Sequence, residues 1–101
     1  MVRRIIWSTR ADNAFLKILE FFIVRNGNRH FSRRLSNEII TVTKLLAIHP
    51  QLGQQSEYKN IRVIITGNYK IYYEAKTECI IIHMVWDCRQ NPDKLKRYLN
   101  E

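Results

Sequence analysis

The sequence predicts an α+β fold of the order β-α-α-β-β-β, in which a helical hairpin packs on one face of a small, mainly antiparallel sheet. Two observations predict this class. Residues 9–49 carry apolar side chains at helical spacing, whereas residues 61–86 contain three short runs rich in isoleucine and tyrosine, separated by turn residues. Because the helices are grouped apart from most of the strands, successive strands are expected to pair directly with one another.

The composition indicates one folded domain, residues 1–101, with a large positive charge. A hydrophobic content of 46% argues against disorder, and 101 residues leave no room for a second domain. Seventeen Lys and Arg residues against nine Asp and Glu residues give a net charge of +8. This excess favours an anionic partner, either nucleic acid or an acidic protein segment, although a basic surface also serves solubility alone.

The N-terminal half predicts a strand followed by two helices. Residues 3–7 combine isoleucine and tryptophan as a half-buried strand does. Residues 9–24 then repeat apolar side chains at helical spacing, and the Asn-Gly-Asn run at 26–28 ends this helix. A second helix is expected over residues 29–49, where Pro50 stops it. Helices joined by so short a connection form an antiparallel hairpin.

The C-terminal half predicts a sheet. Residues 51–60 are polar and are expected to form a loop, after which strands are expected at 61–66, 69–75 and 79–86. The last of these is nearly all apolar, which predicts the central strand, buried on both faces. A polar and charged run, Asp-Cys-Arg-Gln-Asn-Pro, follows it directly and is expected to form one wall of a functional site. The chain closes with a tail or a short helix at 93–99.

Several classes of protein are excluded by what the sequence lacks. No apolar run approaches the roughly 20 residues of a membrane span, and the basic start leads into too short an apolar stretch for a secretory signal. Cys79 and Cys88 bracket one expected strand and are therefore predicted to be reduced thiols. We thus expect a cytoplasmic protein without membrane contact. His30, His49 and His83 show no metal-ligand spacing, and nothing indicates a cofactor or a small-molecule substrate.

Five motifs, in their order and spacing, resemble the RelE/ParE superfamily of type II toxin-antitoxin toxins over essentially the whole chain. They are Ile6-Trp7-Ser8-x-x-Ala11, His49-Pro50-x-x-Gly53, Ile61-Arg62, Gly67-Asn68-Tyr69-Lys70-Ile71-Tyr72-Tyr73 and Val85-Trp86-Asp87-Cys88-Arg89-Gln90-Asn91-Pro92. The resemblance implies a small basic toxin that arrests growth and is neutralised by a cognate antitoxin. Members of the superfamily follow two chemistries.

RelE-like toxins are ribosome-dependent endoribonucleases that cut messenger RNA. Cleavage without a metal requires a base for the 2′-hydroxyl, an acid for the 5′-oxygen and cations around the phosphate. The resemblance places the cations at Arg62, Lys70 and Arg89, and the candidate proton carriers are His83 and Tyr98. If the chain is an enzyme of this kind, Arg62, Lys70, His83 and Arg89 are its expected catalytic residues.

The register of the hairpin at Gly67-Asn68 tests this set. A two-residue turn opposes Thr66 to Tyr69 and places Arg62 and Lys70 on opposite faces of the sheet. A three-residue turn places them on the same face, and only this register allows a shared phosphate site. The sequence leaves both open.

ParE-like toxins inhibit DNA gyrase by recognition, and two features favour this branch. The ending Arg89-Gln90-x-Pro92 and the long helical hairpin resemble ParE-like proteins. Such a protein needs no acid–base pair. The residues expected to contact its target, whether gyrase or ribosome and messenger RNA, are Arg62, Lys70, Arg89, Gln90 and Lys94. An inactive member that retains only antitoxin binding is the remaining alternative, since a fold alone does not determine a function.

The partner implied by the resemblance is an antitoxin with a disordered, acidic segment that folds on binding. Such a segment covers apolar surface beside the hairpin. Phe21, Ile23 and Ile40 lie off the apolar stripes of the two helices. They are the expected antitoxin contacts, and the alternative is that they are ordinary exposed hydrophobic residues.

Overall fold

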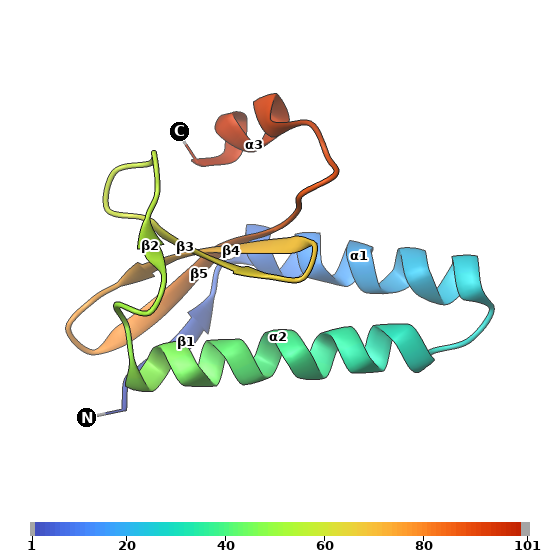
Figure 1. Ribbon diagram of the computed structural model, residues 1–101, viewed down its shortest axis with the longest axis horizontal. Helices are drawn as coiled ribbons and strands as arrows, with labels where there is room; N and C mark the ends of the chain where they lie inside the picture. The colour runs from blue at the N-terminus through green and yellow to red at the C-terminus, as the bar shows by residue number, and fades with distance from the viewer. Residues whose placement is uncertain (1, 100–101) are drawn as a thin grey trace.

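The computed structural model describes residues 2–99, whose elements follow the expected order with one addition. The elements are β1 (Arg4–Trp7), α1 (Thr9–Asn26), α2 (His30–Ile48), β2 (Gln54–Gln55), β3 (Arg62–Thr66), β4 (Tyr69–Ala75), β5 (Cys79–Asp87) and α3 (Pro92–Leu99). The helices α1 and α2 run side by side as a hairpin, and α3 lies apart from them (Figure 1). The addition is β2, so the expectation of a strandless loop at 51–60 is wrong where two residues pair with β3.

The five strands form one sheet in the order β1-β5-β4-β3-β2. The pairs β2–β3, β3–β4 and β4–β5 are antiparallel, as expected for strands joined by short turns. The first strand runs parallel to β5, with Arg4 opposite Cys79 and Trp7 opposite Ile82. The α+β class is therefore confirmed, with a mixed sheet in which β5 is an interior strand and β4 occupies the middle.

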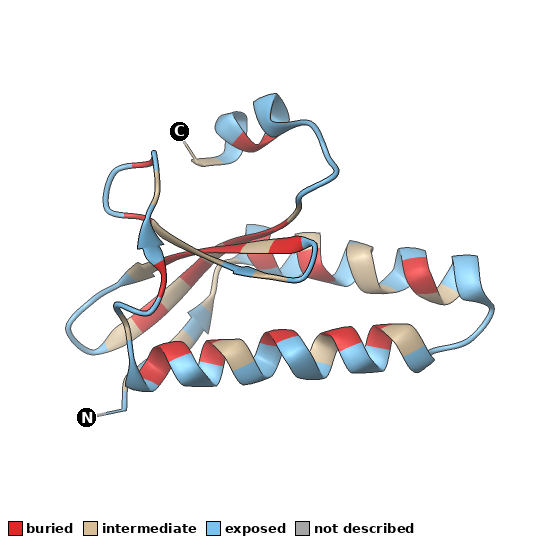
Figure 2. Ribbon diagram, in the orientation of Figure 1, coloured by how far each residue is buried: buried red, intermediate tan, exposed pale blue. Residues whose placement is uncertain are grey.

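The hairpin covers one face of the sheet with the larger core. Ser8 begins α1, because its hydroxyl oxygen accepts a hydrogen bond from the amide of Ala11 at 3.0 Å. Gly27 ends the helix in a left-handed conformation, at a φ of 71°. The residues buried between the hairpin and the sheet are Ala11, Phe15, Phe22, Leu35, Ile39, Leu46, Tyr69, Ile71, Tyr73, Ile80, Ile82 and Val85. Figure 2 shows the buried positions of both helices turned toward the sheet.

The opposite face of the sheet carries a smaller core under α3 and the loop before β3. Its buried members are Tyr58, Ile61, Tyr72, Met84, Trp86 and Leu95. Burial raises the pKa of the Tyr72 phenol to about 12, with the neighbouring Tyr58 adding to the rise. None of the helices within residues 2–99 has the length and apolar character that crossing a membrane requires.

The smaller core on this face contradicts part of one expectation, that β5 is buried on both faces along its whole length. Met84, Val85 and Trp86 are buried in succession and so fill both faces of the sheet, but Ile81 and His83 are only half-buried. The prediction of a strand buried on both faces is therefore wrong for its first half. The reason is that α3 and the loop reach only the far end of this face.

Tyr73 fastens the segment after α2 to the hairpin side of the sheet. Its buried hydroxyl donates a hydrogen bond to the carbonyl of Pro50 at 2.8 Å and accepts one from the amide of Gly53 at 2.9 Å. A Cβ on Gly53 would lie 2.7 Å from the Tyr73 ring, so only glycine fits this close approach. Arg62 completes the arrangement by donating to the Gly53 carbonyl at 2.7 Å.

Candidate interaction groove

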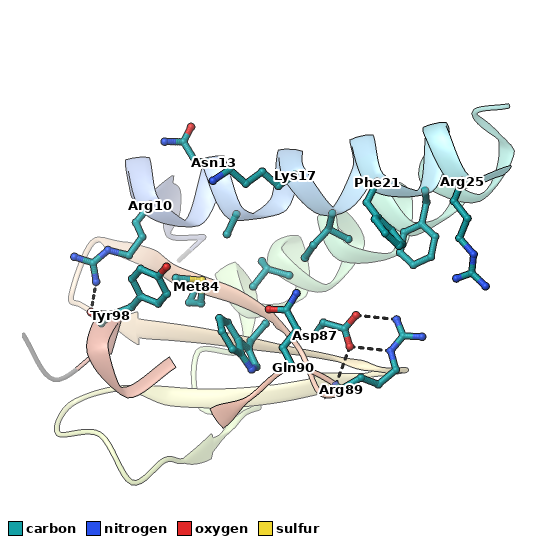
Figure 3. A pocket seen from close by; sticks show the side chains of 15 residues that line it. Arg10, Asn13, Lys17, Phe21, Arg25, Met84, Asp87, Arg89, Gln90 and Tyr98 are labelled. Carbon is teal, nitrogen blue, oxygen red and sulfur yellow. Dashed lines mark hydrogen bonds and ion pairs between the residues drawn. The ribbon is translucent and has the colours of Figure 1, made fainter. Parts of the chain in front are cut away.

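A groove of about 640 Å³ runs between α1, the end of β5 and α3 (Figure 3). Residues about 70 positions apart in the chain meet here, because α1 packs along β5. The groove is lined by Arg10, Asn13, Ala14, Lys17, Ile18, Phe21, Phe22, Arg25, Met84, Val85, Trp86, Asp87, Arg89, Gln90 and Tyr98. The expectation that residues after the last strand form one wall agrees with this placement of Asp87, Arg89 and Gln90.

The groove is apolar along its floor and positive at its rim. Phe21 presents an aromatic ring to it with 57% of the residue exposed. Above this floor, Arg10, Lys17 and Arg25 follow one another at intervals of seven and eight residues, which places them in a row along one side of α1. Among the described residues that line the groove, Asp87 is the one carboxylate. The groove therefore suits an amphipathic segment with an apolar and an acidic side.

The carboxylate of Asp87 is engaged by Arg89 at the mouth of the groove. Arg89 donates from Nε to Oδ1 at 2.9 Å and from Nη2 to Oδ2 at 2.8 Å, and its amide donates to Oδ1 at 2.9 Å. These hydrogen bonds lower the pKa of Asp87, and the same pairing raises the pKa of Arg89. The pair holds the guanidinium in one orientation at the mouth of the groove.

A second arginine ties α3 to α1 across the other end of the groove. Arg10 donates from Nη1 to the carbonyl of Tyr98, and its guanidinium lies 5.5 Å from the centre of the Tyr98 ring. The ring of Tyr98 in turn lies 6.4 Å from that of Trp86. Tyr98, expected as a proton carrier of a nuclease, thus lies between an arginine and a tryptophan.

The hairpin register separates two of the expected catalytic residues. Thr66 opposes Tyr69, so the turn has two residues. Arg62 pairs with Tyr73 and Lys70 pairs with Ile65, which places the two cations on opposite faces and three positions, or about 10 Å, apart along the strands. The structure therefore adopts the register that does not support a shared phosphate site.

The other two expected catalytic residues are each paired with a carboxylate. His83 lies where the β4–β5 register shifts, and its Nε2 is 3.0 Å from Oε1 of Glu74. The same carboxyl group has its other oxygen 3.9 Å from Nζ of Lys76. Arg89 pairs with Asp87. Asp87 ends β5 four residues, or about 13 Å, beyond His83. Arg62, Lys70, His83 and Arg89 thus do not converge on one site.

The structure also distributes the other expected contact residues. Gln90 lines the groove, whereas Lys94 is exposed on α3 and does not. Phe21 lines it, whereas Ile23 is half-buried on α1 and Ile40 is exposed on α2. The row of cations on α1 was not predicted from the sequence, although the spacing of seven and eight residues between Arg10, Lys17 and Arg25 was the available signal.

The described residues contain neither a cluster of potential metal ligands nor a disulfide. Within residues 2–99, no three His, Cys, Asp or Glu side chains gather as metal ligands would. Cys79 and Cys88 are free thiols.

Together, the hairpin, the mixed sheet and the groove define a class of small, basic α+β proteins with a binding surface between helix and sheet. A family model described as the ParE toxin of the type II toxin-antitoxin system, parDE, matches residues 5–92. The chain therefore belongs to the ParE toxin family. The expected membership and the toxin role of this family are thereby supported, and an antitoxin is the partner that this system implies.

A solved structure agrees on the fold. The chain is similar to one described as the chromosomal ParDE TA system from P. aeruginosa, with a TM-score of 0.72 and 17% identity. The match covers 85% of this chain and 96% of the other. None of the curated proteins matches the sequence. At this identity the structural likeness establishes the fold.

Proposed function

We propose that this chain acts in the cytoplasm as a single toxin domain, residues 1–101, that arrests growth by inhibiting DNA gyrase. We further propose that a cognate antitoxin neutralises it by placing an acidic, amphipathic segment in the groove. Membership of the ParE toxin family supports the first step. The apolar floor and the positive rim of the groove support the second.

The observation that carries the gyrase proposal is the separation of the nuclease residues. RNA cleavage requires an acid, a base and cations around a single phosphate. Here Arg62 and Lys70 lie on opposite faces, and His83 is paired with Glu74 far from Arg89. Inhibition by recognition requires no such convergence, so the separation of these residues is compatible with it.

The proposed target contacts lie around the mouth of the groove. Arg89 is oriented there by Asp87, Gln90 lines the same wall, and Lys94 follows in the exposed first turns of α3. Lys70 adds a half-buried cation on the α3 face, whereas Arg62 is already engaged with the carbonyl of Gly53. An antitoxin segment in the groove therefore covers part of this surface, which gives neutralisation by occlusion.

Induced expression without antitoxin, combined with a supercoiling assay on purified gyrase, tests the target. We expect growth arrest, a DNA-damage response, intact messenger RNA and loss of supercoiling. Messenger RNA cut at translated codons, with normal supercoiling, would instead establish the RelE-like alternative. Growth arrest with normal supercoiling and intact messenger RNA would contradict both the gyrase and the messenger RNA proposals.

Phe21→Asp tests the antitoxin site, and Leu16→Asp on the same helix is its matched control. Both residues are exposed, at 57% and 48%, but only Phe21 lines the groove. A carboxylate on the apolar floor would repel an acidic segment, so Phe21→Asp is expected to weaken antitoxin binding at least tenfold, or by about 1.4 kcal/mol. Calorimetric titration of each variant with the purified cognate antitoxin measures this. Equal affinities of the two variants would place the antitoxin elsewhere.

A further inference from the structure

The tip of the helical hairpin carries a cluster of positive charge. From residue 21 to residue 37 the sequence contains no Asp or Glu, yet it contains four arginines and a histidine. Four of these five, Arg29, His30, Arg33 and Arg34, lie at the start of α2 and are here called the arginine cap. All four are exposed. The hairpin extends beyond the sheet at this end, so the cap faces solvent (Figure 1).

The arginines of this cap differ from several other cations of the protein in being unpaired. Arg89 is paired with Asp87 and Lys76 with Glu74, and Arg62 donates to a carbonyl. Among residues 2–99, no ion pair joins a carboxylate to the arginine cap. The guanidinium of Arg34 lies 6.0 Å from the centre of the Phe31 ring. The cap therefore keeps its charges available to an external anion.

The arginine cap lies where the dipole of α2 contributes further positive charge. The cap lies at the N-terminus of α2, the positive end of the helix dipole, and the first turn holds no acidic residue. Arg29 occupies the N-cap position without a side-chain hydrogen bond to the backbone. Cations are unfavourable at this end of a helix. A bound anion relieves their repulsion from the dipole and from one another.

A shallow trough of about 620 Å³ continues from the arginine cap along α2 to the end of β3. Beyond His30, Arg33 and Arg34, its lining consists of Asn37, Glu38, Thr41, Val42 and Thr66. The amide and the two hydroxyl groups are typical partners of phosphate and sugar oxygens. The trough shares no lining residue with the groove, so a segment bound in the groove leaves it open.

We propose that the arginine cap and this trough bind the phosphate backbone of duplex DNA. Three arginines lie between residues 29 and 34, five steps or about 7.5 Å along a helix, and duplex DNA offers one phosphate charge per about 1.7 Å of its axis. No Phe, Tyr or Trp side chain lines the trough, so the stacking platform that single strands require is absent from these described residues. The site thus favours a duplex over unpaired bases.

The test measures binding of a fluorescent 20-base-pair duplex to the full-length chain by anisotropy, in the absence of gyrase and antitoxin. The variant Arg29→Gln/Arg33→Gln/Arg34→Gln removes three cap charges. Its control, Arg4→Gln/Lys59→Gln/Lys96→Gln, removes three exposed charges from β1, a loop and α3. Circular dichroism verifies that both variants are folded. A single-stranded RNA and a polyglutamate peptide serve as competing ligands.

We expect the cap variant to bind the duplex at least ~10-fold more weakly than the control, with a salt slope shallower by about 2.7 for three lost phosphate contacts. For the unmodified chain, these contacts alone predict about 40-fold weaker binding between 50 and 200 mM salt. An equal loss of duplex affinity in both variants would show that binding depends only on the total charge of the protein, and would overturn the proposal. Tighter binding of the RNA or of polyglutamate than of the duplex would overturn it as well. Gyrase inhibition is measured separately, so either proposal can fail alone.

Discussion

The two faces of the sheet are covered in different ways. On one face, α1 and α2, with 18 and 19 residues, bury a core that includes Ile39, Leu46 and Ile71. On the other face, the eight residues of α3 and a loop cover a smaller cluster around Trp86. A helix of eight residues is unstable in isolation, so α3 depends on its contacts. The hairpin face therefore supplies the larger core, whereas α3 depends for its own stability on the contacts of the smaller cluster.

The largest effect is expected from Leu46→Ala on the hairpin face. Leu46 is fully buried, and its truncation removes apolar contact and leaves a cavity. We expect the free energy of unfolding to fall by about 4 kcal/mol, with β-sheet and helix signals lost in one transition. Urea unfolding monitored by circular dichroism and by tryptophan fluorescence measures this. A loss below about 2 kcal/mol would show that the hairpin face is not the main source of stability.

The matched change on the other face is Leu95→Ala. Leu95 is 3% exposed and is the buried residue of α3, held over Tyr72 and Met84. We expect α3 to detach at a cost of about 2 kcal/mol, at the low end for buried leucines, because the helix can separate without opening the rest. Hydrogen exchange will then increase in α3 while β4 and the hairpin stay protected. Uniformly faster exchange throughout the chain would erase the distinction between the faces.

The smallest effect is expected in the pH dependence of stability that the Asp87–Arg89 ion pair at the groove provides. The pairing lowers the folded-state pKa of Asp87 below its unfolded value. Its stabilisation is therefore present above the unfolded pKa, near 3.9, and is lost as the pH falls through the lower folded value. We expect Arg89→Gln to be less stable than the unmodified chain at pH 6 and the difference to close below about pH 4.

Urea unfolding across this pH range, with Lys76→Gln as the control, measures the difference. Lys76 is exposed and lies 3.9 Å from Glu74, so its removal tests a looser pair of the same kind. A difference between the Arg89 variant and the unmodified chain that persists unchanged to pH 2.5 would exclude this ion pair as its source.

Local patterns were sufficient to predict most of the fold. Helical spacing in residues 9–49 and the turn residues between strands are encoded within a few positions of the chain, so the helices and β3 to β5 were predicted with ends close to the observed ones. The two-residue strand β2 has no such pattern, because its pairing depends on Arg62 and Val63 across a loop. The exposure of Ile81 and His83 depends on how far α3 reaches, which no local signal specifies.

The groove was less predictable than the fold. The polar run after β5 identified one wall from composition alone. The other wall, with Lys17 and Arg25, becomes part of the same surface only because α1 packs along a strand about 70 residues away. The pairing of His83 with Glu74 depends in turn on the register shift between β4 and β5. Such juxtapositions are properties of the assembled fold, so periodicity alone did not reveal them.

The parallel pairing of β1 with β5 determines how much of the chain must be synthesised before the five-stranded sheet can form. Arg4 pairs with Cys79, so β1 has no strand to pair with until β5 has been synthesised. A stop codon or frameshift before that point removes the strand that β1 and β4 share and that α1 packs against. Synthesis interrupted before β5 therefore leaves at most the antiparallel strands β2, β3 and β4, without the strand against which β1 and α1 pack. Such fragments also lack Asp87, Arg89 and Gln90, which line one wall of the groove.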